Sequence, residues 1–366
     1  MDAIVRCISG LEEVTLQELK ECLCVEGTLL FPGIILFHPF SQKHLADFCY
    51  ATRSSFFVYE LFSSFDFATF EELQEKLSIL QLKDVKEPFV VRCERKGKHT
   101  FTSQEVERFF GEIIHISSSL KVDLNSPRTI IFVDIQDNHC FVGRDYAGYK
   151  LNKREYRIKT HPLSLNPCIA YVLLRISGWK SKDILLDPFS RSGEICIEAA
   201  LSALQIPGAV HFEDKLAFTK FLDYSFTVEA KEKKLSIHCI DSLHLNVRNS
   251  ETNAKLAGVA QYLTFSRFEV EWLDTKFEKE SIDQIVTVPP SISRIVDQKE
   301  ALRVYNELFY QAEYILKKAG TLILLSKHPE FLKQAASKFI FILEKEITFE
   351  HGTEQFFILR FSKKTI

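Results

Sequence analysis

The sequence predicts an α/β protein in two parts, an N-terminal α+β region followed by a domain with a parallel sheet that ends in an antiparallel hairpin. The first observation is the length of 366 residues, which exceeds one ordinary hydrophobic core. The second is the stretch 183–200, where an apolar run ends in an acid and a turn leads directly into a helical pattern. The third is the pair of apolar runs 339–347 and 355–361, which flank a turn at His351 and Gly352.

The composition indicates a folded protein without a general affinity for nucleic acid or membranes. Apolar residues make up 46% of the chain, and the formal net charge of −3 excludes a uniformly basic coat. Any RNA contact must therefore come from local basic clusters. The nine cysteines are scattered through apolar runs without zinc-ligand spacing, which predicts reduced core thiols and no metal site. No long uncharged apolar run or basic leader is present, so we expect a soluble, untargeted cytoplasmic protein.

Residues 1–50 are expected to form a small α+β module. The runs 3–7 and 34–37 are apolar and of strand length. Between them Leu11, Val14 and Leu19 recur at helical spacing and predict a helix with one apolar face. A helix packed on strands indicates no function by itself.

Residues 51–143 contain a basic turn between a predicted strand and a predicted helix. The strand begins at Phe89, and Thr102 or Ser103 is expected to cap the helix. Cations beside a glycine and a helix N-terminus suit a backbone phosphate. The candidate RNA contacts are Arg92, Arg95, Lys96 and Lys98. The alternative is a solvated charged turn without a ligand.

The segment 144–161 is predicted to be a basic linker between the two parts. It carries six cations and three tyrosines, a mixture that suits phosphate contact and base stacking. The candidate RNA contacts in this linker are Lys153, Arg154 and Arg157. In the alternative interpretation, Tyr156 and Arg157 cover the seam between the domains.

The second domain is expected to span residues 162–366. Its first helix, 165–178, has Pro167 near the first turn and Gly178 as the residue that ends it. The remaining predicted elements are strands at 183–187, 235–241, 281–287 and 320–325, helices at 302–316 and 329–338, and the terminal hairpin. Residues 205–234 match no element.

The turn that follows residues 183–187 resembles motif I of the class I methyltransferases. Asp187, Pro188, Phe189, Ser192 and Gly193 match the form Asp-Pro-Phe-x-Gly-Ser-Gly found in RNA methyltransferases that carry a THUMP domain. The resemblance continues through the basic turn, the linker, the series Asn253 to Gly258 and the Pro-Pro pair. It implies a ferredoxin-like module over 1–50, a THUMP domain over 51–143 and a Rossmann-like methyltransferase domain with a seven-stranded sheet.

The same resemblance implies S-adenosylmethionine as the cofactor and tRNA as the partner. The implied cofactor residues in motif I are Asp187, Ser190, Arg191, Ser192 and Gly193. Asp241 ends the second predicted strand, where an acid bonds the ribose hydroxyls of a nucleotide, and the register of Asn253 favours it over Glu213 or Asp214. Asp274, after the run 268–273, is the implied acid that reads the adenine amino group; a surface carboxylate is the alternative.

Three positions in two motifs depart from the family pattern. Arg191 replaces a glycine, and its side chain would lie where the methionine part of the cofactor passes. The motif that orients a target amine, Asn/Asp-Pro-Pro-aromatic, corresponds here to the catalytic candidates Val288, Pro289, Pro290 and Ser291. Val288 supplies no side-chain acceptor and Ser291 no stacking ring, although a backbone carbonyl of Val288 or Pro289 remains available.

These observations leave two functions of different classes. One is a tRNA guanine-N2 methyltransferase, favoured by Asp187, Gly193, Asp241 and Asp274. The other is a tRNA-binding scaffold with an impaired methyltransferase domain, favoured by Arg191, Val288 and Ser291. A methyltransferase with another target, and a partner subunit that repairs the loop, also stay open.

Overall fold

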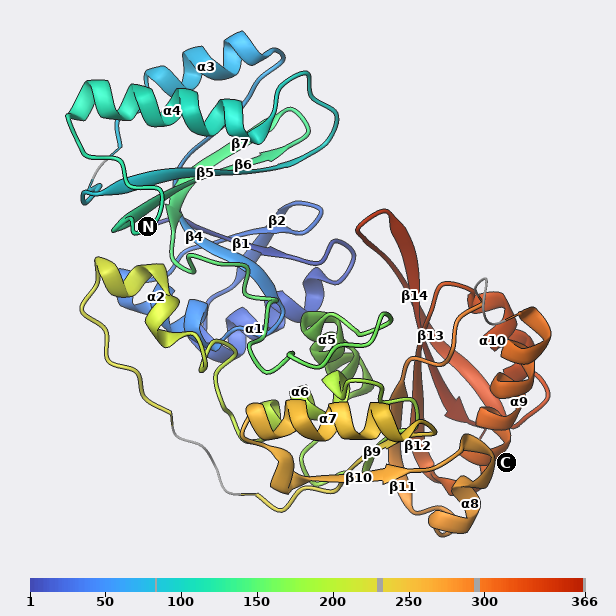
Figure 1. Ribbon diagram of the computed structural model, residues 1–366. Coiled ribbons are helices and arrows are strands. Elements are labelled where there is room, and N and C mark those ends of the chain that lie inside the picture. The colour runs from blue at the N-terminus through green and yellow to red at the C-terminus, as the bar shows by residue number, and fades with distance from the viewer. Residues whose placement is uncertain (83, 229–232, 293–296, 365–366) are drawn as a thin grey trace. The chain divides into compact units, whose positions relative to one another are not determined.

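The computed structural model describes residues 1–82, 84–228, 233–292 and 297–364, and the chain divides into two compact units. The first unit comprises Met1–Cys7, Leu16–Leu151 and Phe212–Thr227. The second comprises Ile8–Thr15, Asn152–His211 and Val228–Ile366. Each unit contains a seven-stranded sheet (Figure 1). In the described residues, no helix has the length and apolar character needed to cross a membrane.

The sheet of the first unit runs through both of its predicted modules. Its strand order is β2-β3-β1-β4-β7-β6-β5. The strand β4 (Ser55–Asp66) joins the halves, because its first residues pair with β1 and its later residues pair with β7. The other strands are β1 (Ala3–Cys7), β2 (Gly27–Phe31), β3 (Ile34–Phe37), β5 (Phe89–Lys96), β6 (Thr129–Gln136) and β7 (His139–Asp145). The expected ferredoxin-like and THUMP modules thus share one continuous sheet.

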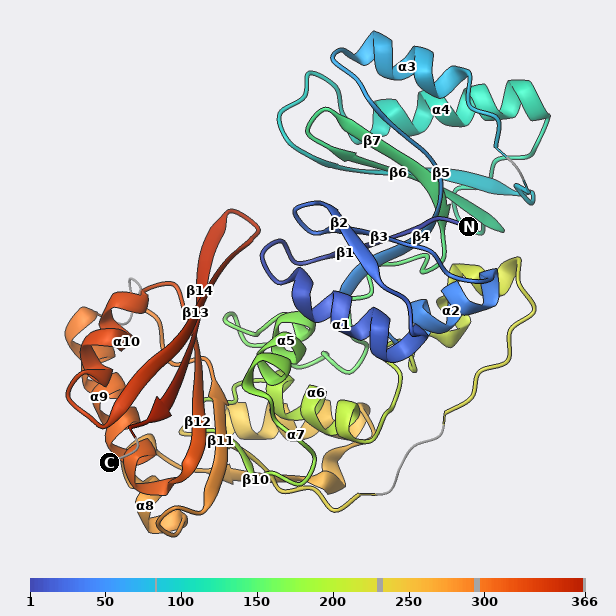
Figure 2. The same ribbon diagram turned by 180° about the vertical axis from the view of Figure 1, so that it is seen from behind.

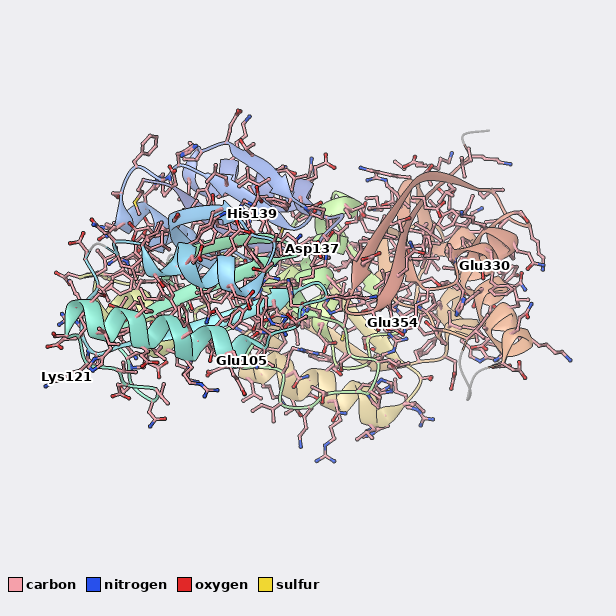
Figure 3. All side chains as sticks on the ribbon, turned by 90° about the horizontal axis from the view of Figure 1, so that it is seen from above. Glu105, Lys121, Asp137, His139, Glu330 and Glu354 are labelled. Carbon is pink, nitrogen blue, oxygen red and sulfur yellow. The ribbon has the colours of Figure 1, made fainter. Side chains whose placement is uncertain are left out.

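Four helices accompany this part of the chain: α1 (Glu12–Leu23), α2 (Gln42–Ala51), α3 (Phe70–Ser78) and α4 (Ser103–Ser118). The start of α4 confirms Thr102 as the cap. The Thr102 hydroxyl accepts from the Glu105 backbone N–H at 3.2 Å, and the Glu105 carboxylate accepts from the Thr102 N–H at 2.7 Å. Figure 3 shows Glu105 and Lys121 toward opposite ends of α4.

The segment that matched no predicted element returns to the first unit. Residues 212–227 carry two short 3-10 turns, Glu213–Lys215 and Ala217–Lys220. Their backbone bonds to the end of the first unit, with Ala217 N–H to the Ala147 carbonyl at 3.1 Å and Phe218 N–H to the Tyr146 carbonyl at 3.1 Å. Sequence patterns missed this segment because its bonds are to residues about 70 positions earlier in the chain.

The second unit confirms the predicted Rossmann-like fold. Its strand order is β10-β9-β8-β11-β12-β14-β13, parallel except for the pairs made by β14. The strands are β8 (Leu185–Asp187), β9 (Ile237–Asp241), β10 (Leu263–Arg267), β11 (Ile282–Thr287), β12 (Leu316–Ser326), β13 (Phe341–His351) and β14 (Glu354–Lys363). The predicted terminal hairpin is β13 and β14.

Helices lie on both faces of this sheet. Figure 2 shows α5 (Pro167–Ser177) and α6 (Glu194–Ala203) on one side of β11 and β12, with α8 (Leu273–Lys276), α9 (Gln298–Ile315) and α10 (Pro329–Ala336) on the other. The helix α7 (His244–Leu256) follows β9. Since β8, β9 and β11 are parallel, their carboxyl ends share one edge, which brings the predicted site residues together.

Candidate functional site

The motif I loop runs from Asp187 at the end of β8 to the start of α6. Gly193 precedes α6 with φ +86, and a Cβ at this position would lie 2.8 Å from the Cβ of Ser250 on α7. Glycine is therefore required both by the backbone conformation and by the close approach of α7. Arg191 also has positive φ, +48, in the position where the family has the first glycine of the loop.

Asp241 holds this loop from the end of β9. Its Oδ2 accepts from the Arg191 backbone N–H at 3.0 Å, and its Oδ1 accepts from Leu243 N–H and the Asn246 side-chain amide, each at 3.0 Å. Asp241 is buried, with 6% of its surface exposed. The acid predicted to bond a ribose is thus fixed beside motif I.

A cavity of about 270 Å³ opens at this edge of the sheet. Asp241, Arg191, Phe268, Glu269 and Pro290 are among its lining residues. Asp241 supplies a carboxylate suited to ribose hydroxyls, Phe268 an apolar ring, and Glu269 an acceptor suited to an amino group. The cavity has the size and chemistry of a nucleoside site.

The prediction for Asp274 is wrong. This residue lies in α8 with an exposed side chain, and it is absent from the cavity lining; its backbone N–H donates to the Gln311 side chain at 2.8 Å. The strand ends earlier than expected, at Arg267, so the acid that follows it into the cavity is Glu269. The run 268–273 is more apolar than β10, so the sequence pattern predicts the strand there, and the acid after it, Asp274, was chosen in place of Glu269.

The space between motif I and the Pro-Pro segment is nearly filled. A second cavity there has a volume of only about 10 Å³, and its lining includes Asp187, Ser190, Arg191 and Val288. This is room for about one water molecule. Ser192 and Gly193 line neither this cavity nor the larger one.

Both proline carbonyls of the predicted catalytic segment are occupied from within the chain. Arg191 Nη2 donates to the Pro289 carbonyl at 3.4 Å, and the Tyr305 hydroxyl donates to the Pro290 carbonyl at 2.6 Å. Val288 and Ser291 are half-buried. The arginine therefore reaches the carbonyl that would receive a target amine.

Burial perturbs the charged groups of the loop. It raises the pKa of Asp187 to about 7, against the opposing effect of the Thr287 hydroxyl, which donates to Asp187 Oδ1 at 2.5 Å. Burial also lowers the pKa of Arg191, while Asp187, Asp241 and Glu194 act in the opposite direction. Burial thus favours the uncharged form of both Asp187 and Arg191.

The linker is bound to the helix that follows motif I. Arg154 Nε donates to Glu198 at 3.1 Å and the Tyr156 hydroxyl donates to the same Glu198 oxygen at 3.0 Å. All three side chains are buried, so Arg154 as an RNA contact is wrong. Arg157 pairs with Glu194 at 3.2 Å and keeps 22% of its side chain exposed. Lys153 is exposed.

Asn253 is a second residue whose role the sequence analysis missed. Its side-chain amide donates to the carbonyls of Lys159 at 2.8 Å and Ser192 at 3.0 Å, and its Oδ1 accepts from the Lys159 N–H at 3.0 Å. The Ser192 hydroxyl accepts from the His161 N–H at 3.0 Å. Asn253 thus joins the linker to motif I. In the sequence, only its position at the start of the Asn-Ala-x-x-Ala-Gly series pointed to a role for Asn253.

The predicted basic turn is exposed at the end of β5. Lys96 and Lys98 are both exposed. Arg92 donates to the Leu124 carbonyl at 2.9 Å, while Arg95 donates to the Ser103 hydroxyl at 3.3 Å and lies 5.3 Å from the Phe101 ring centroid. Glu94, which opposed these cations in the sequence, is paired with Lys150 at 2.7 Å. The two lysines therefore keep their charge available to a partner.

The beginning of β7 lies beside this basic turn. His99 Nε2 bonds at 2.7 Å to the carbonyl of Asp137, which lies between the end of β6 and His139, the first residue of β7; both Asp137 and His139 are labelled in Figure 3.

The site fits one half of S-adenosylmethionine better than the other. The larger cavity offers Asp241, Phe268 and Glu269 to an adenosine. The methionine half would require the space that the Arg191 side chain and the 10 Å³ cavity leave closed, and the sulfonium would meet a guanidinium of the same charge. The residues therefore do not fit the complete cofactor in this conformation.

Two family descriptions match the chain. The one for an RMKL-like methyltransferase domain matches residues 154–354, and the one for a THUMP domain matches residues 67–145. The solved structure of SMU.472, a putative methyltransferase complexed with SAH, is similar with a TM-score of 0.82 and 19% identity over 100% of this chain and 98% of that one. At that identity the likeness shows the fold.

Curated relatives agree with these matches. A tRNA (guanine(6)-N2)-methyltransferase of Methanocaldococcus jannaschii is 32% identical over 72% of this chain and 73% of its own length. One of Archaeoglobus fulgidus is 30% identical over 68% of this chain; there the match spans less than two thirds of the relative, 63%. The chain therefore belongs to the family of S-adenosylmethionine-dependent RNA methyltransferases in which a THUMP domain accompanies an RMKL-like methyltransferase domain.

Proposed function

We propose that this protein binds tRNA as a member of the tRNA guanine-N2 methyltransferase type, and that its transfer of a methyl group to a base amine is feeble or lost. The THUMP domain and the names of the relatives support tRNA as the partner. The exposed side chains of Lys96, Lys98 and Lys153 support these three lysines as RNA contacts. Arg92, Arg95 and Arg157 can contribute after exchanging their present partners.

The observation that carries the impaired reaction is the position of Arg191. Because Val288 stands where the family has an asparagine, the Pro289 carbonyl is the remaining acceptor for the target amine. The Arg191 guanidinium already donates to this carbonyl. Losing one preorganised polar group commonly costs about 10²–10³ in rate. The absence of a stacking ring at Ser291 weakens the hold on the base further.

The experiment is transfer of labelled methyl groups to tRNA by the unaltered protein, with tRNA binding measured in parallel. We expect binding with little or no transfer. The variant Arg191→Gly/Val288→Asn/Ser291→Tyr should gain transfer, because it reopens the loop and restores the amine acceptor and the ring. Robust transfer by the unaltered protein would refute the proposed impairment, and absence of tRNA binding would refute the proposed partner.

A second candidate is an active methyltransferase in which Arg191 moves aside when the substrates bind. The long 3.4 Å bond to the Pro289 carbonyl favours it, because such a bond costs little to break. In that case Arg191→Gly alone should leave transfer unchanged or faster, and a main-chain carbonyl must be sufficient to orient the amine.

A further inference from the structure

The motif I loop carries two buried polar side chains with few partners, Arg191 at both cavities and Ser190 at the small cavity alone. Arg191 is nine-tenths buried, yet its side chain makes one long hydrogen bond, at 3.4 Å, although a guanidinium has five N–H donors. Across the described residues, no carboxylate lies within ion-pair distance of it. The neighbouring Ser190 hydroxyl is buried and has no hydrogen-bond partner. A cation and a hydroxyl left this way at one loop are suited to an anionic group.

The position of this loop is fixed relative to the candidate ribose acceptor. Asp241 Oδ2 accepts directly from the Arg191 backbone N–H at 3.0 Å. A ribose held by Asp241, with its base toward Phe268 and Glu269, would place its 5′ substituent on the motif I side of the cavity. Arg191 lines that cavity as well as the small one. The group attached to the 5′ carbon therefore meets the guanidinium.

Two of the four acids that line this cavity are engaged in ion pairs, since Glu271 and Glu300 pair with Arg303 at 2.7 Å and 2.9 Å. Glu194, which lines the small cavity, pairs with Arg157 at 3.2 Å. This leaves Asp241 for the ribose and Glu269 for an amino group of the base. On the 5′ side the cation is Arg191, and the Asp187 carboxyl beside it in the small cavity accepts from the Thr287 hydroxyl.

We propose that this site binds an adenosine 5′-phosphate, such as AMP, in preference to S-adenosylmethionine. A phosphate accepts two parallel N–H bonds from a guanidinium, whereas a sulfonium is repelled by it. A 5′-phosphate is also much shorter than a methionine chain, so it does not require the closed space beside Val288. This inference deepens the proposed function, since it rests on Arg191 excluding the methionine part.

The test is titration calorimetry of the full-length chain with adenosine, AMP and S-adenosylhomocysteine, in a buffer free of phosphate. We expect AMP to bind at least about tenfold more tightly than adenosine, because a charge-assisted hydrogen-bond pair contributes on that scale, and S-adenosylhomocysteine to bind more weakly than AMP. Arg191→Gly should abolish the preference for AMP and improve binding of S-adenosylhomocysteine. Arg191→Asn, whose new residue tolerates positive φ, serves if the glycine variant fails to fold.

Asp241→Asn is the matched control at the ribose end, and it should weaken adenosine and AMP by the same factor. Equal affinity for adenosine and AMP in the unaltered protein would overturn the inference, as would an AMP preference that survives both substitutions of Arg191. Tighter binding of S-adenosylhomocysteine than of AMP would also overturn it. If AMP is not preferred while methyl transfer stays absent, this inference alone fails; robust methyl transfer refutes the proposed function.

Discussion

Replacing Arg154 should destabilise the second unit, whereas replacing its neighbour Lys153 should not. The Arg154 and Glu198 side chains are 4% and 0% exposed, and their ion pair spans 3.1 Å. Arg154→Ala leaves the Glu198 carboxylate buried with Tyr156 as the donor shown to remain. Breaking a buried pair on one side costs about 3–5 kcal/mol.

That loss corresponds to a fall in the thermal midpoint of about 6–20 °C, because 1 kcal/mol shifts a domain of this size by about 2–4 °C. Differential scanning calorimetry measures it on the full chain. Lys153→Ala is the matched control, since this exposed side chain should alter tRNA affinity and leave the midpoint within about 1 °C, as is usual for surface substitutions.

The double variant Arg154→Met/Glu198→Leu tests whether the stability lost in Arg154→Ala comes from leaving Glu198 as an unpaired buried charge. Replacing both partners by apolar residues of similar size is often neutral, so it should recover most of the lost stability. A midpoint for Arg154→Ala within about 1 °C of the unaltered protein would refute the structural role. Loss of tRNA affinity in that variant without loss of stability would return Arg154 to the RNA-binding surface.

Three further outcomes are expected. Lys96→Ala/Lys98→Ala should weaken tRNA binding and reduce the slope of log affinity against log salt by about two, since each phosphate contact releases about one counterion; an unchanged slope in filter binding places the RNA elsewhere. Glu269→Gln should weaken adenosine binding in calorimetry while Asp274→Ala should not, because only Glu269 lines the cavity; equal losses would contradict the assignment of β10. Asp187 has its pKa raised from 3.8 to about 7, so the folded state holds its proton more tightly and stability falls as pH rises through that window. Asp187→Asn should flatten that fall in denaturant titrations, and an unaltered pH dependence would show that Asp187 titrates as in the unfolded chain.

Strands were predictable where the chain is buried on both faces. β8 and β9 lie inside the second sheet and are mostly apolar, so the acids that end them, Asp187 and Asp241, were predicted. β10 (Leu263–Arg267) is an edge strand with one fully buried residue, and its apolar pattern was weaker than that of the following loop. The error at Asp274 follows from this difference, since a loop that packs on the core is as apolar as a strand.

The fate of the basic residues could not be read from their order in the chain. Lys153 and Arg154 are adjacent and equally charged, yet one is exposed and the other is buried against Glu198, 44 residues away. A sequence displays the cation but not the carboxylate that folding brings opposite it. The same limitation concealed Asn253, whose partners Lys159 and Ser192 lie on two other segments.

Arg191 shows how one substitution can change the chemistry of a retained fold. The sequence predicted a conflict between its side chain and a methionine chain, but it could not give the direction of that side chain. In the structure Arg191 has a left-handed backbone conformation, which is the conformation that glycine favours. Asp241 accepts from the backbone N–H of Arg191, a group that a glycine would also have. The bond between the Arg191 N–H and Asp241 belongs to the backbone, so it does not require a particular side chain at position 191. The guanidinium lines the larger cavity and donates to the Pro289 carbonyl, so in the proposed function it takes the space of a positively charged methyl donor and presents its N–H groups to an anion.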